Sequence, residues 1–342
     1  MKTRFPNKVF TAILTLSYLF FCSLLWRGPG GEVLSQTPEF TVIQTGIPSG
    51  DSSYYHVCKI SEDEFWAIGK KGIITKFGTS GIAETFSYPN KGVDLLNMVL
   101  MDDNNYLLCG DKGFIYQFSK SAQSWNVLQV KGYENSCFYS VCAIDNNTAF
   151  ISGGRSKIVK SQRVVPLGFI LKTEDGGKTW KQVFRSVSGM IWSVKYEKET
   201  NQILALVYSP VKTRLIYSAD KGMTWKPKEK KIKGLFHDFN ISEGKLFLAG
   251  GKNGNYRKNG AVRFEKNIFL FENSGIFWDV EANKTLTIAS GTDGNLLIKK
   301  FSEDWKLLKS PVTNNLYEVC FIDEKSAFLV GNNKTILKVE FK

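Results

Sequence analysis

Seven segments of the chain repeat one pattern of apolar and polar positions. Each begins with an apolar strand, passes through a short polar turn and ends in a second apolar strand, usually closed by glycine. The central apolar residues of the seven first strands lie 39 to 53 residues apart and are Val57, Met98, Val141, Val194, Phe239, Val280 and Val319. A repeat of roughly 40 residues that contains several short strands is typical of a propeller blade.

Each repeat can be divided into four strands, which in the second repeat are residues 98–101, 106–109, 114–118 and 125–130. Several first strands are apolar on both faces, as expected of innermost strands packed between neighbouring blades. The last repeat contains only three strands and ends with residues 336–341. We expect residues 40–44 to supply the fourth strand and so remove an exposed sheet edge. The sequence therefore predicts an all-β fold over residues 31–342, a seven-bladed β-propeller of four-stranded antiparallel blades closed by the N-terminal strand.

One turn sequence occurs twice, as TEDGGKTW at residues 173–180 and as SADKGMTW at residues 218–225. Its Asp can accept hydrogen bonds from backbone N–H groups two or three residues later, its Gly can adopt a positive φ, and its Trp is expected to start the next strand. A catalytic carboxylate would need a partner and a cleft, and the box supplies neither. We therefore assign a structural role to Asp175, Gly177, Trp180, Asp220, Gly222 and Trp225.

The two boxes, together with glycine turns at residues 69–72 and 110–113, resemble BNR (Asp-box) propellers, which belong with WD-repeat-like propellers. Among them the chain looks most like the photosystem II assembly and stability factor-like family. The resemblance covers essentially residues 38–342, although only two boxes are complete and residues 118–125 carry a degenerate one. It implies a non-enzymatic scaffold that binds a protein partner and helps to assemble or stabilise a membrane complex. It does not imply that the partner is a photosystem.

The N-terminus has the pattern of a membrane-targeting segment. Basic residues Lys2, Arg4 and Lys8 precede an uncharged apolar run over residues 9–26. Residues 1–30 are therefore either a cleaved signal peptide or a retained membrane anchor. Lipidation at Cys22 is a third reading, disfavoured because Phe21 stands where a small residue is needed. All three place the propeller outside the cytoplasm, in the periplasm or at the cell surface, because the basic flank stays inside.

The other cysteines favour neither disulfides nor metal. Three of them directly follow a central apolar residue, at positions that blade rotation keeps apart, so they are interpreted as small buried apolar residues. The chain has no C-x-x-C pair and only two histidines, and no metal or cofactor is predicted. The five cysteines are Cys58, Cys109, Cys137, Cys142 and Cys320.

The formal net charge of +13 narrows the class of partner. A basic protein outside the cytoplasm favours acidic protein surfaces, acidic glycans or anionic membrane surfaces. Nucleic acid is not expected, because the compartment is wrong and no nucleic-acid-binding motif is present. We expect the chain to act as a monomer.

A candidate binding surface follows from the repeat register. In a propeller the innermost strands all begin at one face, around the mouth of the channel. The residues two before the seven central positions are Tyr55, Leu96, Tyr139, Trp192, His237, Trp278 and Tyr317, and the residues one before are all polar. Turns on the same face carry Lys70, Lys71, Lys112, Arg155, Arg163 and Arg257. Aromatic faces beside cations suit a partner segment, a sugar or a pigment-like ring. Alternatively, the aromatic residues fill the space between blades and the basic turns form a solvated rim.

Two other functions remain open, a glycan-binding adhesin or lectin and a sialidase-like glycoside hydrolase. A sialidase would need an Arg triad and a Tyr nucleophile with a Glu, and the sequence shows neither. Asp238, Asp279 and Glu318 are the only clustered carboxylates that could form an acid/base pair. The sequence therefore favours binding over catalysis.

Overall fold

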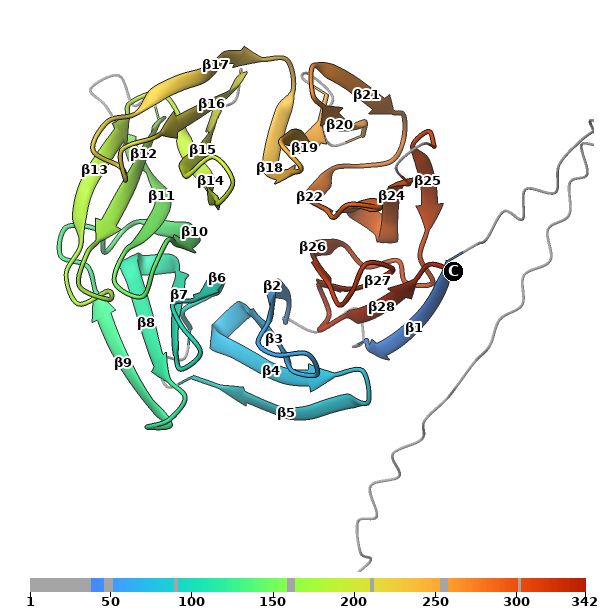
Figure 1. The fold of residues 1–342 in the computed structure, drawn as a ribbon, viewed down its shortest axis with the longest axis horizontal. Coiled ribbons are helices and arrows are strands. Elements are labelled where there is room, and N and C mark those ends of the chain that lie inside the picture. Colours follow the sequence, from blue (N-terminus) through green and yellow to red (C-terminus); the bar gives the residue numbers. More distant parts are fainter. Residues whose placement is uncertain are drawn as a thin grey trace, which may run out of the picture. The chain divides into compact units, whose positions relative to one another are not determined.

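The computed structural model describes residues 38–342 apart from 46–51, 89–91, 159–163, 210–211, 253–257 and 301–302. The described residues form seven four-stranded antiparallel sheets arranged in a ring (Figure 1). This confirms the predicted seven-bladed β-propeller. The predicted targeting segment lies outside the described residues. Within the described part, no helix is long and apolar enough to cross a membrane.

Six blades are built from four consecutive strands, numbered here from the channel outward. Blade 1 comprises β2 (Tyr54–Lys59), β3 (Phe65–Gly69), β4 (Ile73–Gly78) and β5 (Gly81–Ser87). Blade 2 comprises β6 (Leu95–Leu100), β7 (Asn105–Gly110), β8 (Phe114–Ser119) and β9 (Ser124–Gln129). Blade 3 comprises β10 (Cys137–Ala143), β11 (Ala149–Ile158), β12 (Val164–Thr173) and β13 (Lys181–Ser186).

Blade 4 comprises β14 (Met190–Glu197), β15 (Gln202–Ser209), β16 (Lys212–Ser218) and β17 (Lys226–Ile232). Blade 5 comprises β18 (Leu235–Ser242), β19 (Lys245–Gly251), β20 (Gly260–Phe264) and β21 (Asn267–Phe271). Blade 6 comprises β22 (Phe277–Ala282), β23 (Leu286–Gly291), β24 (Asn295–Lys300) and β25 (Lys306–Lys309). Short 3₁₀ turns follow the second strand in three blades: η1 (Lys70–Gly72), η2 (Asp111–Gly113) and η3 (Thr292–Gly294).

The seventh blade joins the two ends of the propeller. It contains β26 (Leu316–Phe321), β27 (Ser326–Gly331) and β28 (Ile336–Glu340), and its outer strand is β1 (Glu39–Gln44). β1 pairs antiparallel with β28, and Phe40 lies opposite Val339 (Figure 1). Phe40 also packs on a cluster that includes Leu337 and Phe341. The predicted closure by the N-terminal strand is therefore confirmed.

The hydrophobic core lies between the blades. One cluster, for example, joins Trp66 and Ile68 of blade 1 to Tyr106 and Leu108 of blade 2. Second strands such as β27 are buried along their whole length, whereas the outer strand β17 is largely exposed and rich in lysine. This gradient explains why the inner strands are apolar on both faces, since each is covered by a blade on either side.

Both copies of the repeated turn share the hydrogen bonds of the Asp carboxylate to a Thr four residues later. Asp175 accepts hydrogen bonds from the Thr179 backbone N–H at 2.9 Å and the Thr179 hydroxyl at 2.6 Å, and Asp220 does the same with Thr224. In both turns a backbone contact reaches four residues along the chain, one farther than predicted, and Asp175 also has the predicted contact three residues on, with Lys178. Both glycines have positive φ, 89° and 84°. Trp180 and Trp225 lie immediately before β13 and β17, so they do not start these strands as predicted.

Replacing Asp175 or Asp220 with Ala is expected to destabilise the fold modestly. Each variant loses hydrogen bonds that stabilise an exposed turn, and we expect the Tm of each variant to fall by about 2 °C. Thermal melts should be compared with Lys178→Ala in the first turn as the control. Unchanged melting together with lost partner binding would show that the boxes act in recognition.

Candidate functional site

Every innermost strand contains a β-bulge at the same repeat position. In blade 1, Tyr54 pairs with Gly69 and His56 pairs with Ile68, so Tyr55 is the extra residue at the bulge. The other six blades show the same shift. The seven bulge residues are Tyr55, Leu96, Tyr139, Trp192, His237, Trp278 and Tyr317. A β-bulge changes the direction in which a side chain points, and here it directs the predicted ring residues toward one cavity.

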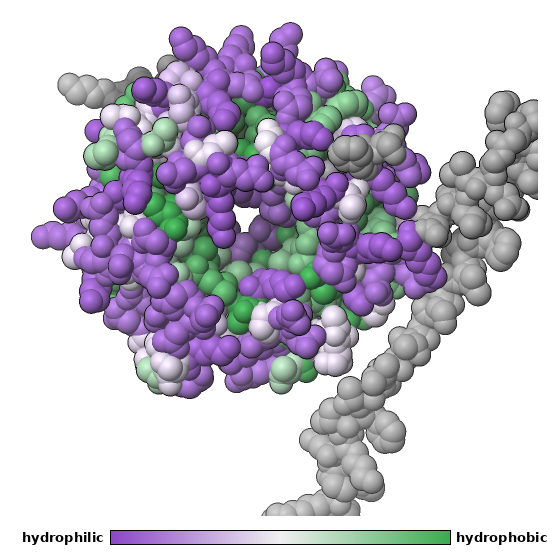
Figure 2. Space-filling model, viewed as in Figure 1, coloured by the Kyte–Doolittle hydropathy of each residue, from purple (hydrophilic) through white to green (hydrophobic). Residues whose placement is uncertain are grey.

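All seven bulge residues line one cavity of about 260 Å³, which we name the mouth cavity. The remaining lining residues are Asn97, Ser140, Ser193, Lys195, Asp238 and Glu318. In the space-filling view the ring has a central opening, with apolar residues beside it and a mainly hydrophilic rim (Figure 2). The structure therefore brings the predicted aromatic positions together.

Six of the bulge residues form a continuous series of ring contacts, which we name the aromatic arc. The centroid distances lie between 4.6 and 5.9 Å along the series Tyr139, Trp192, His237, Trp278, Tyr317 and Tyr55. Leu96 of blade 2 interrupts the ring. The arc is contributed by six different blades, so its geometry depends on the closed propeller.

His237 has an unusual environment at the centre of this arc. Its side chain lies between Trp192 and Trp278, and the residue is only 6% exposed. Burial lowers its pKa to about 4, so the imidazole is neutral at pH 7. Neither ring nitrogen, nor the indole N–H of Trp192 or Trp278, has a hydrogen-bond partner among the described residues. Buried polar atoms without partners are uncommon and costly, and four of them gather at the centre of the arc.

Charged groups from blades 4 to 6 meet beside the arc. The Lys195 ammonium is 2.8 Å from Asp238 and 3.2 Å from Glu281, and Asn240 donates a 2.7 Å hydrogen bond to Glu281. Burial opposes the charge on Lys195, but the two carboxylates outweigh it and raise its pKa well above the usual value. The pKa of Asp279 is also raised well above its usual value, by burial and by the neighbouring Glu318 and Asp238.

A second ion pair joins blades 1 and 7. His56 Nδ1 lies 2.8 Å from Glu318, and its Nε2 donates to the Met98 carbonyl at 3.2 Å. Burial alone would lower the pKa of His56, but the Glu318 carboxylate outweighs it and the pKa rises to about 10. His56 is therefore a cation at neutral pH.

The predicted basic residues do not join the arc. Lys70, Lys71 and Lys112 lie in η1 and η2, but Arg155 lies in strand β11, which continues past the predicted turn. None of these four residues lines the mouth cavity. The Lys112 ammonium donates to the Gly92 carbonyl at 2.7 Å, and Arg155 donates to the Gly132 carbonyl at 2.8 Å. Turns after the second strand lie at least one strand spacing, about 4.8 Å, farther from the channel, and this places them at a rim. Arg163 and Arg257 lie outside the described residues.

The sequence reasoning missed Lys195, Asn240 and Glu281. They directly follow the central positions of blades 4 to 6, the repeat position that holds cysteine in three other blades. Cys142 is buried as predicted, but Cys58 and Cys320 are only half-buried and pack against the core clusters between blades. The five described cysteines are free thiols. The polar residues after Val194, Phe239 and Val280 were the signal that could have revealed this second ring.

Among the described residues, one group has the spacing of metal ligands. Carboxylate oxygens of Asp238, Asp279 and Glu281 lie within 4.8 Å of one another. Lys195 already bridges two of these carboxylates, and burial raises the pKa of the third group, Asp279. The cluster therefore balances its charge with an ammonium group.

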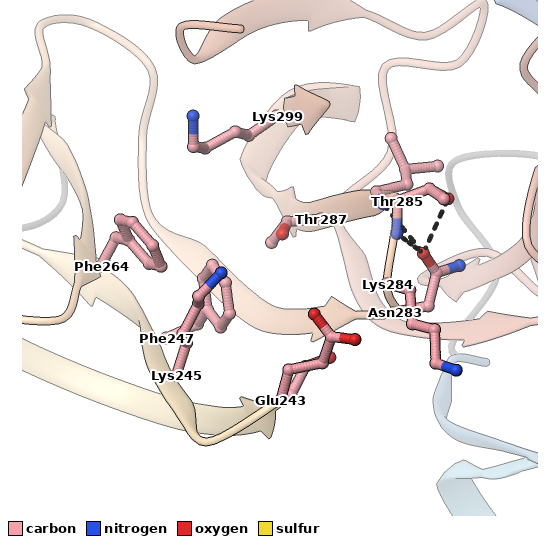
Figure 3. A pocket seen from close by; sticks show the side chains of 11 residues that line it. Glu243, Lys245, Phe247, Phe264, Asn283, Lys284, Thr285, Thr287 and Lys299 are labelled. Atoms are coloured by element: carbon pink, nitrogen blue, oxygen red, sulfur yellow. Dashed lines mark hydrogen bonds between the residues drawn. The ribbon is translucent and has the colours of Figure 1, made fainter. Parts of the chain in front are cut away.

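A second cavity, of about 240 Å³, lies between blades 5 and 6. It is formed by the turns after β18 and β22, so it is on the face opposite the mouth cavity. Figure 3 shows Phe247 and Phe264 on one side of it and Lys284 and Glu243 near its turns. Asn283 accepts backbone hydrogen bonds that shape the second turn, and no residue predicted for binding lies there.

The two histidines are expected to change stability with pH in opposite directions. His237 has a lowered pKa, so its contribution is present above pH 6.5 and is lost as pH falls through about 4, on the order of 3 kcal/mol in full. His56 has a raised pKa, so its contribution is present below pH 6.5 and is lost as pH rises through about 10. Urea unfolding from pH 4 to 10 measures both. In the plot of unfolding free energy against pH, His237→Phe should reduce the loss of stability on the acid side, and His56→Gln should reduce the loss on the alkaline side. A pH dependence that neither substitution changes would contradict these assignments.

Comparisons with known proteins identify related folds. No family model and no curated protein matches the chain. Similar solved structures include YCF48 bound to a D1 peptide, with a TM-score of 0.65 and 16% identity over 89% of this chain and 95% of that chain. YCF48 from Cyanidioschyzon merolae gives 0.63 and 15% identity over 88% and 98%, and virginiamycin B lyase from Staphylococcus aureus gives 0.63 and 10% over 88% and 99%. At these identities the likeness shows the propeller fold alone.

Proposed function

We propose that this chain is a non-enzymatic scaffold outside the cytoplasm that binds a segment of a protein partner at the mouth cavity, the partner being a subunit of a membrane complex. The aromatic arc carries the proposal. Seven bulges direct their side chains into one cavity, where the buried polar atoms of His237, Trp192 and Trp278 lack partners among the described residues. An aromatic surface with unsatisfied polar groups suits a ligand that is part apolar and part peptide backbone.

Other observations support this assignment. One structural neighbour is YCF48 with a bound D1 peptide, and the repeated boxes resemble those of BNR propellers and photosystem II assembly factors. The N-terminal 30 residues have the composition of a signal or anchor, which supports a location outside the cytoplasm.

The carboxyl groups at the cavity favour binding over glycoside hydrolysis. A glycosidase needs one carboxyl group that holds a proton beside the scissile bond. Burial and the neighbouring Glu318 and Asp238 raise the pKa of Asp279, but the residue is 1% exposed and does not line the mouth cavity. Asp238 does line it, but Lys195 overcomes the effect of burial and lowers its pKa. The candidate acid/base pair is therefore split between a buried acid and a paired carboxylate.

Site-specific photocrosslinking tests the proposal in cells. The photoreactive residue p-benzoylphenylalanine is introduced in place of Tyr317 at the arc and, as a matched control, in place of Leu307, an exposed residue of the outer strand β25. We expect a discrete adduct with a membrane-complex subunit from the Tyr317 position only. Adducts that are the same from both positions, or an adduct at Tyr317 with glycan alone, would overturn the proposal.

A further inference from the structure

The mouth cavity and the cluster directly behind it contain more acidic than basic groups. Four carboxyl groups, Asp238, Asp279, Glu281 and Glu318, surround two cations, Lys195 and His56. Even with Asp279 protonated, three carboxylates face two cations. This local surplus is opposite in sign to the formal charge of the whole chain, +13, so the cavity is an acidic spot in a basic protein.

Two of these carboxylates reach the cavity beside aromatic rings. Asp238 directly follows His237 and Glu318 directly follows Tyr317, and their side chains are 17% and 23% exposed. Aromatic faces attract cations, and a carboxylate beside them adds charge pairing. The chain itself displays this chemistry, since the Lys195 ammonium contacts Asp238 and Glu281 and lies 5.7 Å from the centroid of Phe239.

The size of the cavity limits what it can accept. At about 260 Å³ it is smaller than the roughly 300–1,000 Å³ typical of pockets for whole small molecules. It suits one inserted side chain. His237 lines the same cavity, 6% exposed and with both ring nitrogens unpartnered among the described residues, which indicates a place built for a ligand.

We propose that the mouth cavity selects a lysine or arginine side chain of the partner segment, with its stem against the aromatic arc and its charged group at Asp238 and Glu318. This inference rests on the proposed function and specifies its ligand. The basic rim outside the cavity would then suit acidic residues that flank the inserted cation.

The inference is tested with short peptides and the full-length purified protein. The probes are the pentapeptide Gly-Gly-Lys-Gly-Gly and matched peptides with norleucine or glutamate at the centre, and the readouts are titration calorimetry and the indole N–H NMR signals of Trp192 and Trp278. We expect the lysine peptide to bind at least fivefold more tightly than the norleucine peptide, and the glutamate peptide to bind more weakly still. Equal binding of lysine and norleucine, or preference for glutamate, would overturn the inference.

Substitutions separate recognition from folding. Glu318→Gln should weaken binding of the lysine peptide at least fivefold, whereas Glu303→Gln, whose carboxylate pairs with Lys306 away from the cavity, should leave binding unchanged. Lys195→Met should strengthen binding severalfold, because it releases two carboxylates, and a misfolded protein cannot mimic that gain. Absence of both effects would refute a charge-selective cavity.

The two proposals fail in different ways. If the Tyr317 position still crosslinks to the partner but the protein shows no preference for the lysine peptide, only this inference fails. If the protein prefers the lysine peptide but the Tyr317 position gives no crosslink, the proposed function fails.

Discussion

Deleting residues 38–45 is expected to cost the propeller at least about 5 kcal/mol, enough to unfold much of the protein at 37 °C. The strand β1 pairs with β28 along the seventh blade, and its Phe40 packs on the core cluster between blades 6 and 7. Fully burying a Phe contributes about 1.5–3 kcal/mol, of which the partly buried Phe40 supplies a share. Each lost ladder hydrogen bond costs about 1 kcal/mol. The free energy of unfolding of a natural domain is only about 5–15 kcal/mol. Because β28 would also become an exposed edge, aggregation should accompany unfolding.

Chemical denaturation of the purified protein measures this effect, and two controls sharpen it. Phe40→Ala keeps the strand and removes only the packing, so it should lose about half as much stability. Val42→Thr changes an exposed side chain of the same strand and should change little. Adding a peptide of residues 38–45 to the deletion variant should restore stability in proportion to its concentration. A deletion variant that unfolds at the wild-type denaturant concentration would show that β1 does not close the ring.

The blade count and the ring closure could be predicted because burial leaves a mark on the sequence. Innermost and second strands are covered on both faces, so runs such as Phe65–Gly69 are apolar throughout and recur with each blade. The missing fourth strand was equally visible, since one apolar segment near the N-terminus was left without a blade. Both inferences depend on how much apolar surface a strand buries, and the amino-acid composition of the strand reflects that amount.

The details of the site could be predicted only in part, because a bulge leaves no mark on composition. The ring residues were found by register alone, but simple strand alternation fails at a bulge. The ladder shifts register at Trp192, so alternation counted from the start of the strand does not give the face of Lys195. The basic residues were predicted from their turns, but sequence order does not show how far a turn lies from the channel. Distance from the axis is a property of the closed ring.

Replacing Trp192 and Trp278 together with Ala is expected to abolish partner crosslinking from the Tyr317 position. The two indoles enclose His237 at the centre of the aromatic arc, and central aromatic residues typically carry most of the energy of an interface. Losing two such contacts should weaken binding by at least a hundredfold, as each hot-spot truncation costs about 2 kcal/mol or more.

Loss of stability is the alternative cause of such a result, and the controls must separate the two. Truncating a fully buried Trp costs about 3–5 kcal/mol, although both indoles here are only partly buried. Trp305→Ala is the matched control, because this Trp packs against the core cluster of blades 5 and 6 and is absent from the mouth cavity. Charge reversal at Lys70, Lys71 and Lys112 should act differently, slowing encounter at low salt and having little effect at high salt, where exposed charges are screened. If the double Trp variant is folded and still crosslinks its partner while Trp305→Ala behaves in the same way, the arc only packs the channel, and the binding surface must lie elsewhere on the propeller.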